Sequence, residues 1–262
     1  MDPLVRNNVK VAGGGQQAII FAHGFGCDQH MWRYVAPAFE PTHRVVLFDH
    51  VGNGGSHLGA WDADKYGSLE GYAQDVLEIC RALEIRDAVF VGHSVSAMIG
   101  LIAAKRDPGA LSRLVLVGPS PCYIDDGDYV GGFARGDIEE LLQFMDSNYL
   151  GWSSMLAPQI MRNVDRPELA EELTNSFCRT DPEIAKHFAR VTFLSDNRDD
   201  LEDVRTPCLI LQCSDDVIAP EPVGRYVQSR LPGSELVLMK ATGHCPNLSA
   251  PEETIAAIRQ WL

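Results

Sequence analysis

The sequence predicts an α/β fold in which a mostly parallel central sheet has helices on both faces and a helical cap over one edge. Three observations support this. Short apolar runs alternate with longer helix-like segments, the runs are continuous as in buried parallel strands, and one long stretch contains only helix-like segments. The expected strands are 18–22, 45–48, 88–91, 114–117, 208–211 and 236–239.

Two segments outside the long helical stretch have clear helix signals. The segment 69–83 repeats apolar residues at the spacing of one helix face. The final segment begins at Pro251 and continues with two glutamates, and both residue types suit a helix N-terminus. The run Gly13-Gly14-Gly15 is expected to form a hairpin turn.

The long helical stretch covers residues 122–196 and is too long to be a loop. It is expected to cover the carboxyl edge of the sheet, where open α/β folds bind ligands. We therefore predict an α/β core formed by 1–121 and 197–262, with a four-helix cap formed by 122–196. The helix-like segments within the cap are 138–149, 152–161, 168–178 and 182–194.

Composition narrows the class of function. The formal net charge of −14 argues against a nucleic-acid surface, because phosphate binding needs clustered Lys and Arg. The seven cysteines include no C-x-x-C pair and are interpreted as structural thiols in a reducing cytoplasm. Without a signal-peptide pattern or an apolar run of about 18 residues, no membrane association is expected. We also expect no metal and no cofactor, and a monomer by default.

The candidate nucleophile is Ser94, in the sequence Gly92-His93-Ser94-Val95-Ser96. A buried strand leads into this turn and an apolar helix pattern follows, which places a serine in a strained turn with its Oγ exposed. The residues two before and two after the nucleophile must be small. Gly92 satisfies this, whereas Ser96 stands where the pattern has glycine. Ser96→Gly is therefore expected to keep or raise activity.

A second loop supplies the expected oxyanion hole. His23-Gly24-Phe25-Gly26 directly follows the first strand, and in this arrangement such a loop offers a backbone N–H to the developing oxyanion. The other donor is the residue after the nucleophile. The two predicted donors are thus the N–H groups of Phe25 and Val95.

An acid and a histidine follow two later strands. Asp215 and Asp216 come after the strand 208–211, and His244 comes after the strand 236–239. This gives the chain order Ser, Asp, His. His244 is expected to take the serine proton, and Asp216, rather than Asp215, to fix the imidazole.

The chain also resembles a known family along almost its whole length. The stretches that carry the resemblance are FAHGFGCDQ at 21–29, VGHSV at 91–95, VGPSPCY at 117–123, GHCP at 243–246, and the cap segments 149–152 and 193–196. They resemble the RsbQ-like α/β-hydrolases, a family that includes a bacterial regulator of the general-stress sigma factor B and the plant strigolactone and karrikin receptors.

This resemblance implies an α/β-hydrolase fold, a V-shaped four-helix cap, and a catalytic triad of Ser94, Asp216 and His244. It also implies a mostly apolar pocket, which favours a small hydrophobic ligand. The residues it places on the pocket wall are Phe25, Val95, Phe133, Trp152, Leu156, Ala189 and Phe193.

Two functions are therefore expected. The first is a serine hydrolase that cleaves a small hydrophobic ester, lactone or butenolide-like compound through an acyl-enzyme, in stress signalling. The alternative is a ligand-sensing module with slow hydrolysis that acts through a protein partner, of the PAS-domain phosphatase type. A dehalogenase or epoxide hydrolase is disfavoured because those reactions need a carboxylate nucleophile, whereas perhydrolase and C–C bond hydrolase activities stay open.

Overall fold

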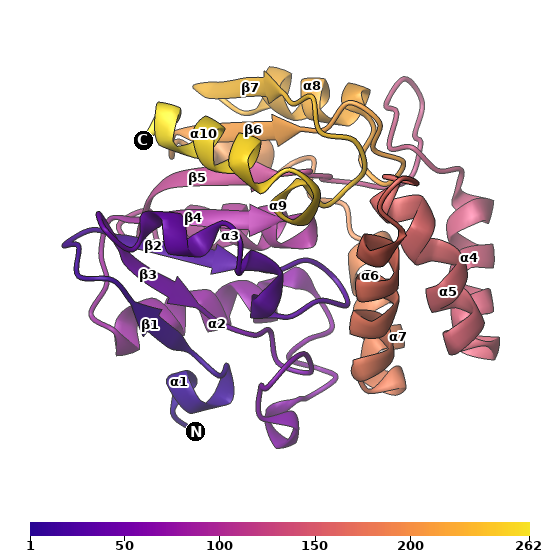
Figure 1. The fold of residues 1–262 in the computed structure, drawn as a ribbon, viewed down its shortest axis with the longest axis horizontal. Helices are drawn as coiled ribbons and strands as arrows, with labels where there is room; N and C mark the ends of the chain where they lie inside the picture. Colours follow the sequence, from indigo (N-terminus) through magenta and orange to yellow (C-terminus); the bar gives the residue numbers. More distant parts are fainter.

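The structure is a computed structural model that describes residues 1–262, and its centre is a seven-stranded sheet (Figure 1). The strand order is β1-β3-β2-β4-β5-β6-β7, and every neighbouring pair is parallel except β1 with β3. All six expected strands are present. The strands are β1 (Lys10–Ala12), β2 (Ala18–Ala22), β3 (Arg44–Leu47), β4 (Ala88–His93), β5 (Leu111–Val117), β6 (Cys208–Gln212) and β7 (Ser234–Leu238).

The expected hairpin at Gly13–Gly15 is wrong. These glycines do connect β1 to β2, but β1 pairs antiparallel with β3, so the two connected strands are not neighbours. Gly13 and Gly15 are needed because the connection passes close to the backbone that precedes β3: a Cβ on Gly15 would lie 2.1 Å from the carbonyl oxygen of Thr42, and one on Gly13 would lie 2.3 Å from that of His43. β1 itself is short and exposed on every residue, so it has no apolar pattern from which a strand could be predicted.

Side chains of the central strands alternate between two apolar clusters, one on each face of the sheet. In β2, Ile19 and Phe21 face one cluster, while Ile20 and Ala22 face the other. The first face is covered by the 3₁₀ turns η1 (Gln29–Trp32) and η2 (Ala36–Phe39) and by α9 (Pro246–Ser249) and α10 (Pro251–Trp261). The second face is covered by α2 (Leu69–Ala82), α3 (Val95–Arg106) and α8 (Glu221–Arg230).

Four helices lie between β5 and β6 in the sequence and stand beyond the carboxyl ends of the strands in Figure 1. One apolar cluster runs without a break from the first sheet face into these helices. We call them the cap helices; the division of the chain into core and cap domains stays a prediction. The cap helices are α4 (Arg135–Ser147), α5 (Tyr149–Met161), α6 (Pro167–Arg179) and α7 (Pro182–Phe193).

The remaining elements are short and peripheral: α1 (Pro3–Arg6) and the 3₁₀ turns η3 (Leu58–Ala60) and η4 (Leu201–Asp203). No helix has the length and apolar character needed to cross a membrane.

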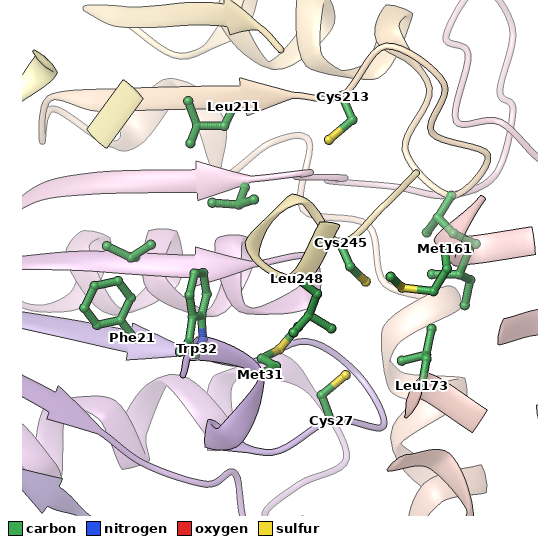
Figure 2. Packing of buried hydrophobic residues seen from close by; sticks show 14 of the residues in the cluster. Phe21, Cys27, Met31, Trp32, Met161, Leu173, Leu211, Cys213, Cys245 and Leu248 are labelled. Atoms are coloured by element: carbon green, nitrogen blue, oxygen red, sulfur yellow. The ribbon is translucent and has the colours of Figure 1, made fainter. Parts of the chain in front are cut away.

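Several sulfur-containing side chains lie where the sheet meets the cap. Six of the seven cysteines are buried, and Cys178 is exposed. Burial raises the pKa of Cys27 to about 12, so this thiol stays protonated and unreactive at neutral pH. Figure 2 shows the neighbours that surround this junction: Cys27, Met31, Met161, Leu173, Cys245 and Leu248.

Candidate active site

Ser94 lies in the sharp turn between β4 and α3. Its backbone is in the left-handed region (φ +56°), which is costly for a residue with a Cβ and is held by the flanking strand and helix. The Ser94 N–H donates to the Val117 carbonyl at 2.8 Å. Gly92 is required on the other side of the turn, since a Cβ there would lie 2.4 Å from the carbonyl oxygen of Ser96.

The structure brings together Ser94, His244 and Asp216, three residues that follow three different strands. His244 Nε2 lies 2.7 Å from Ser94 Oγ, and His244 Nδ1 lies 2.6 Å from Asp216 Oδ2. All three side chains are buried. The second oxygen of Asp216 accepts from the backbone N–H groups of Ile218 (2.8 Å) and Ala219 (3.0 Å), so the carboxylate is fixed on both sides.

Asp215, the neighbouring acid, points away from this group. It is exposed and accepts two hydrogen bonds from the Arg162 guanidinium, at 2.9 and 3.2 Å. The two adjacent acids thus have opposite environments, one at the surface and one against the imidazole.

Gly118, at the end of β5, contacts the His244–Asp216 pair. Its φ is +58°, and a Cβ there would lie 3.1 Å from His244 Cε1 and 3.2 Å from His244 Nδ1. A glycine is therefore needed both for its backbone conformation and for the space that the imidazole occupies.

The two expected oxyanion donors are in the loop after β2 and at the start of α3. The Phe25 N–H has no hydrogen-bond partner within the protein. Val95 is the first residue of α3, where a backbone N–H has no intrahelical acceptor. The loop that carries Phe25 packs tightly on the turn: a Cβ on Gly24 would lie 2.6 Å from His93 Nδ1 and 3.3 Å from Ser94 Cβ.

His93, directly before Ser94, and Ser96, two residues after it, connect the nucleophile turn to neighbouring loops. His93 Nε2 donates to the His244 carbonyl at 2.7 Å. Burial, and to a smaller extent the nearby His244, lower the pKa of His93 to about 3, so this imidazole is neutral. The Ser96 hydroxyl donates to the His23 carbonyl at 2.5 Å and contacts His50 Nε2 at 2.7 Å. The Ser96 side chain is thus directed toward His23 and His50.

A small cavity of about 30 Å³ adjoins Ser94 and His244. Ligand pockets commonly hold roughly 300–1,000 Å³, so an ester can reach Ser94 only if the surrounding side chains or cap helices move. Of the expected pocket residues, Phe25 and Phe193 line this cavity. The other lining residues are Cys27, His93, Tyr123, Ile160, Leu173, Phe177, Thr192 and Cys245.

The other expected wall residues are not on the cavity surface. Trp152 stands one layer behind it, with its ring packed against Phe25 (6.1 Å between centroids) and Phe177 (5.2 Å). Phe133, Leu156 and Ala189 pack within the same apolar cluster but do not line the cavity. The Val95 side chain packs in the cluster on the opposite face of the sheet.

Tyr123 and Phe177 are wall residues that the sequence did not single out. Burial raises the pKa of Tyr123 above its ordinary value, and the Ser94 hydroxyl beside it acts in the opposite direction. Phe177 was visible only as one apolar position on the helix face of α6. A larger surface groove of about 510 Å³ lies between the start of α2 and the end of α7 and contains no residue of the Ser94 group.

The sheet order, the cap helices and the serine in its strained turn define a protein of the α/β-hydrolase class. A sequence profile of the alpha/beta hydrolase family matches residues 19–257, and the chain belongs to this family. The solved structure of a hydrolase from Oleispira antarctica is 44% identical, covers 99% of this chain and 96% of its own, and superposes with a TM-score of 0.97.

Two plant relatives are similar over nearly their full length. A karrikin insensitive 2 receptor from Petunia hybrida is 38% identical and aligns with 96% of this chain and 94% of its own. A strigolactone esterase from Arabidopsis thaliana is 39% identical, with 97% and 96% aligned. The resemblance to the receptor branch is thus confirmed at the level of strigolactone and karrikin receptor homologues.

Proposed function

We propose that the chain is a serine hydrolase that cleaves a small hydrophobic ester, lactone or butenolide-like compound through an acyl-enzyme on Ser94. The observation that carries the proposal is the buried series Ser94 Oγ, His244 Nε2, His244 Nδ1 and Asp216 Oδ2, whose two contacts are 2.7 and 2.6 Å. The esterase activity in the name of the Arabidopsis relative supports the same reaction type.

In the proposed reaction, His244 Nε2 takes the proton from Ser94 Oγ as the oxygen attacks the substrate carbonyl. The carbonyl oxygen becomes an oxyanion, and the free N–H groups of Phe25 and Val95 stabilise it. His244 then gives its proton to the leaving alcohol or enol oxygen, and water hydrolyses the acyl-enzyme by the same steps. Asp216 keeps the Nδ1 proton directed toward itself and stabilises the imidazolium.

The substrate class follows from the walls around Ser94. Phe25, Phe177, Phe193 and Tyr123 surround the serine with aromatic surface and offer few polar partners. Such a site favours an apolar acyl group over a sugar or a peptide.

Hydrolysis of p-nitrophenyl acetate tests the proposal. Purified protein is expected to cleave the ester, and Ser94→Ala is expected to lose that activity by at least about 10³-fold while keeping the same thermal midpoint. Equal rates for the two proteins would refute the nucleophile assignment.

A second candidate function is a ligand sensor with slow hydrolysis that signals through a protein partner. Backbone contacts that join the cap to the catalytic loop favour it: the His244 N–H donates to the Ile160 carbonyl of α5 at 2.8 Å. The Asn163 side chain donates to the carbonyls of Met161 (2.6 Å) and Thr242 (3.1 Å). A ligand that displaces α5 would therefore displace the His244 loop.

We place this sensor in cytoplasmic stress signalling, as in the RsbQ-like proteins, with a PAS-domain phosphatase as partner. A sensor is expected to bind a purified PAS-domain phosphatase with an affinity that changes when a butenolide is added. Asn163→Ala, which loosens the cap from the His244 loop, is expected to reduce that change. If the affinity for the phosphatase does not change with ligand, the sensor proposal is refuted and only the hydrolase proposal stands.

A further inference from the structure

A buried chain of polar groups lies beside the Ser94 turn and is used by no step of the proposed reaction. The Ser96 hydroxyl donates to the His23 carbonyl at 2.5 Å, and His50 Nε2 lies 2.7 Å from the same hydroxyl. The His50 N–H donates to His23 Nε2 at 3.0 Å. All three residues are fully buried.

The protons in this chain have one consistent arrangement. A carbonyl oxygen only accepts, so the single Ser96 proton is directed to His23, and His50 Nε2 must carry a proton and donate it to Ser96. His23 Nε2 accepts from the His50 N–H, so its Nδ1 carries the proton and donates to the Gly24 carbonyl at 2.8 Å. Burial lowers the pKa of both histidines, so both rings are neutral and the protons of the chain have only this arrangement.

The chain joins the ends of three adjacent strands. His50 follows β3, His23 follows β2, and Ser96 follows β4 at the second position of α3. No backbone N–H donates to the His23 carbonyl, so the Ser96 hydroxyl is its hydrogen-bond partner. Phe25, the proposed oxyanion donor, is two residues after His23 in the same loop.

We propose that Ser96, held by His50, is a positioning residue that fixes the His23–Phe25 loop so that the Phe25 N–H meets the oxyanion formed at Ser94. This inference rests on the proposed hydrolase function. A glycine at position 96 could not make either contact, and the His23 carbonyl would then lose its hydrogen-bond partner. A donor that is displaced from the oxyanion loses stabilisation that exists mainly in the transition state, so kcat falls while KM stays nearly constant.

The test compares Ser96→Ala with the wild-type protein. The variant keeps the Cβ and removes only the hydroxyl, and we expect kcat for p-nitrophenyl acetate to fall by about 10- to 100-fold with KM within twofold. A small alkylboronic acid probes the oxyanion hole directly, because Ser94 Oγ adds to boron, His244 takes the proton, and a boron-bound oxygen occupies the hole. Its inhibition constant is expected to rise by the same factor as kcat falls.

Three further variants separate positioning from general destabilisation. Ser153→Ala is the matched control, because Ser153 is also buried and donates to a backbone carbonyl (Tyr149, 2.9 Å) but lies in α5 outside the site. It is expected to keep kcat and boronate affinity. His50→Phe is expected to lower kcat several-fold, and His50→Gln, which restores an N–H near Ser96, to recover most of the loss.

The outcomes are distinguishable. Unchanged kcat and boronate affinity in folded Ser96→Ala and His50→Phe would overturn the positioning role and leave the hydrolase intact. A lower thermal midpoint with unchanged kcat and KM would also overturn it, since the hydroxyl would then serve stability alone. If Ser96→Ala does not fold, His50→Phe and His50→Gln decide the question. A wild-type protein without esterase activity or boronate binding would overturn both proposals.

Discussion

Acid is expected to destabilise this fold through His93, the residue before the nucleophile. His93 is buried, its Nδ1 has no partner, and burial lowers its pKa to about 3. In the unfolded chain the imidazole has a pKa near 6.5, so between this pH and the folded-state pKa the unfolded state binds a proton at His93 and the folded state does not. The stability that His93 contributes is therefore present above pH 6.5 and is lost as the pH falls toward 3.

The size of the loss follows from the two pKa values. Between pH 7.5 and 5.5, the difference in proton binding at His93 lowers the free energy of unfolding by about 1.4 kcal/mol. Because pH 5.5 lies well above the folded-state pKa, this number depends mainly on the unfolded-state value. His23 and His50, whose pKa values are also lowered by burial, add losses in the same direction.

Urea unfolding at the two pH values measures the effect. His93→Gln removes the titrating group, so its loss of unfolding free energy between pH 7.5 and 5.5 is expected to be smaller than that of the wild type by about 1.4 kcal/mol. The control is the same substitution at the exposed His57, which is expected to leave the pH dependence unchanged. An identical pH dependence in His93→Gln and wild type would refute the reasoning.

Three further predictions concern the site. Asp216→Asn is expected to lower kcat on the order of 10³-fold by disturbing the His244 tautomer, while Asp215→Asn, at the adjacent exposed position, is expected to keep it. Gly118→Ala is expected to lower kcat several-fold and stability by about 1–2 kcal/mol, measured by esterase assay and urea unfolding, because its Cβ would crowd His244 in a left-handed backbone. Phe193→Ala enlarges the cavity and is expected to raise the ratio of kcat/KM for hexanoate over acetate esters roughly tenfold; an unchanged ratio would contradict the cavity assignment.

The sheet could be predicted from the sequence because its central strands are buried on both faces and therefore contain continuous apolar runs. β2 and β4 are examples, with every residue buried. β1 lacks this signal: its three residues are exposed, and its pairing with β3 depends on a contact between segments distant in the sequence. α8 was also missed, since the short segment Glu221–Arg230 offers few apolar positions.

The site was predictable where order along the chain and strand ends constrain it, as for Ser94, His244 and Asp216. Asp215 and Asp216 are adjacent, so their order along the chain does not distinguish them. The structure does: Asp216 is buried, whereas Asp215 is exposed and contacts Arg162. The cavity wall was predicted less well. Trp152 and Phe177 pack against each other, and only Phe177 lines the cavity. Which of the two rings lines it depends on how the cap helices pack, and this packing cannot be predicted from a local sequence pattern.

The role of Ser96 was the feature that the sequence pattern described least well. Because the turn pattern has glycine at this position, the sequence predicts that Ser96→Gly keeps or raises activity. The structure instead gives the hydroxyl two buried contacts, to His23 and His50, so we now expect loss of activity when it is removed. His50 is distant in the sequence and follows a different strand, so only the folded chain reveals the pair.

The most direct test of the central claim is to locate the acyl group on the protein. A fluorophosphonate or a slowly hydrolysed p-nitrophenyl ester is added to the wild type, and intact-mass measurement followed by peptide mapping locates the adduct. We predict a single adduct on Ser94, absent from Ser94→Ala and strongly reduced in His244→Ala. An adduct on another residue, or equal labelling of Ser94→Ala, would contradict the assignment of Ser94 as the nucleophile.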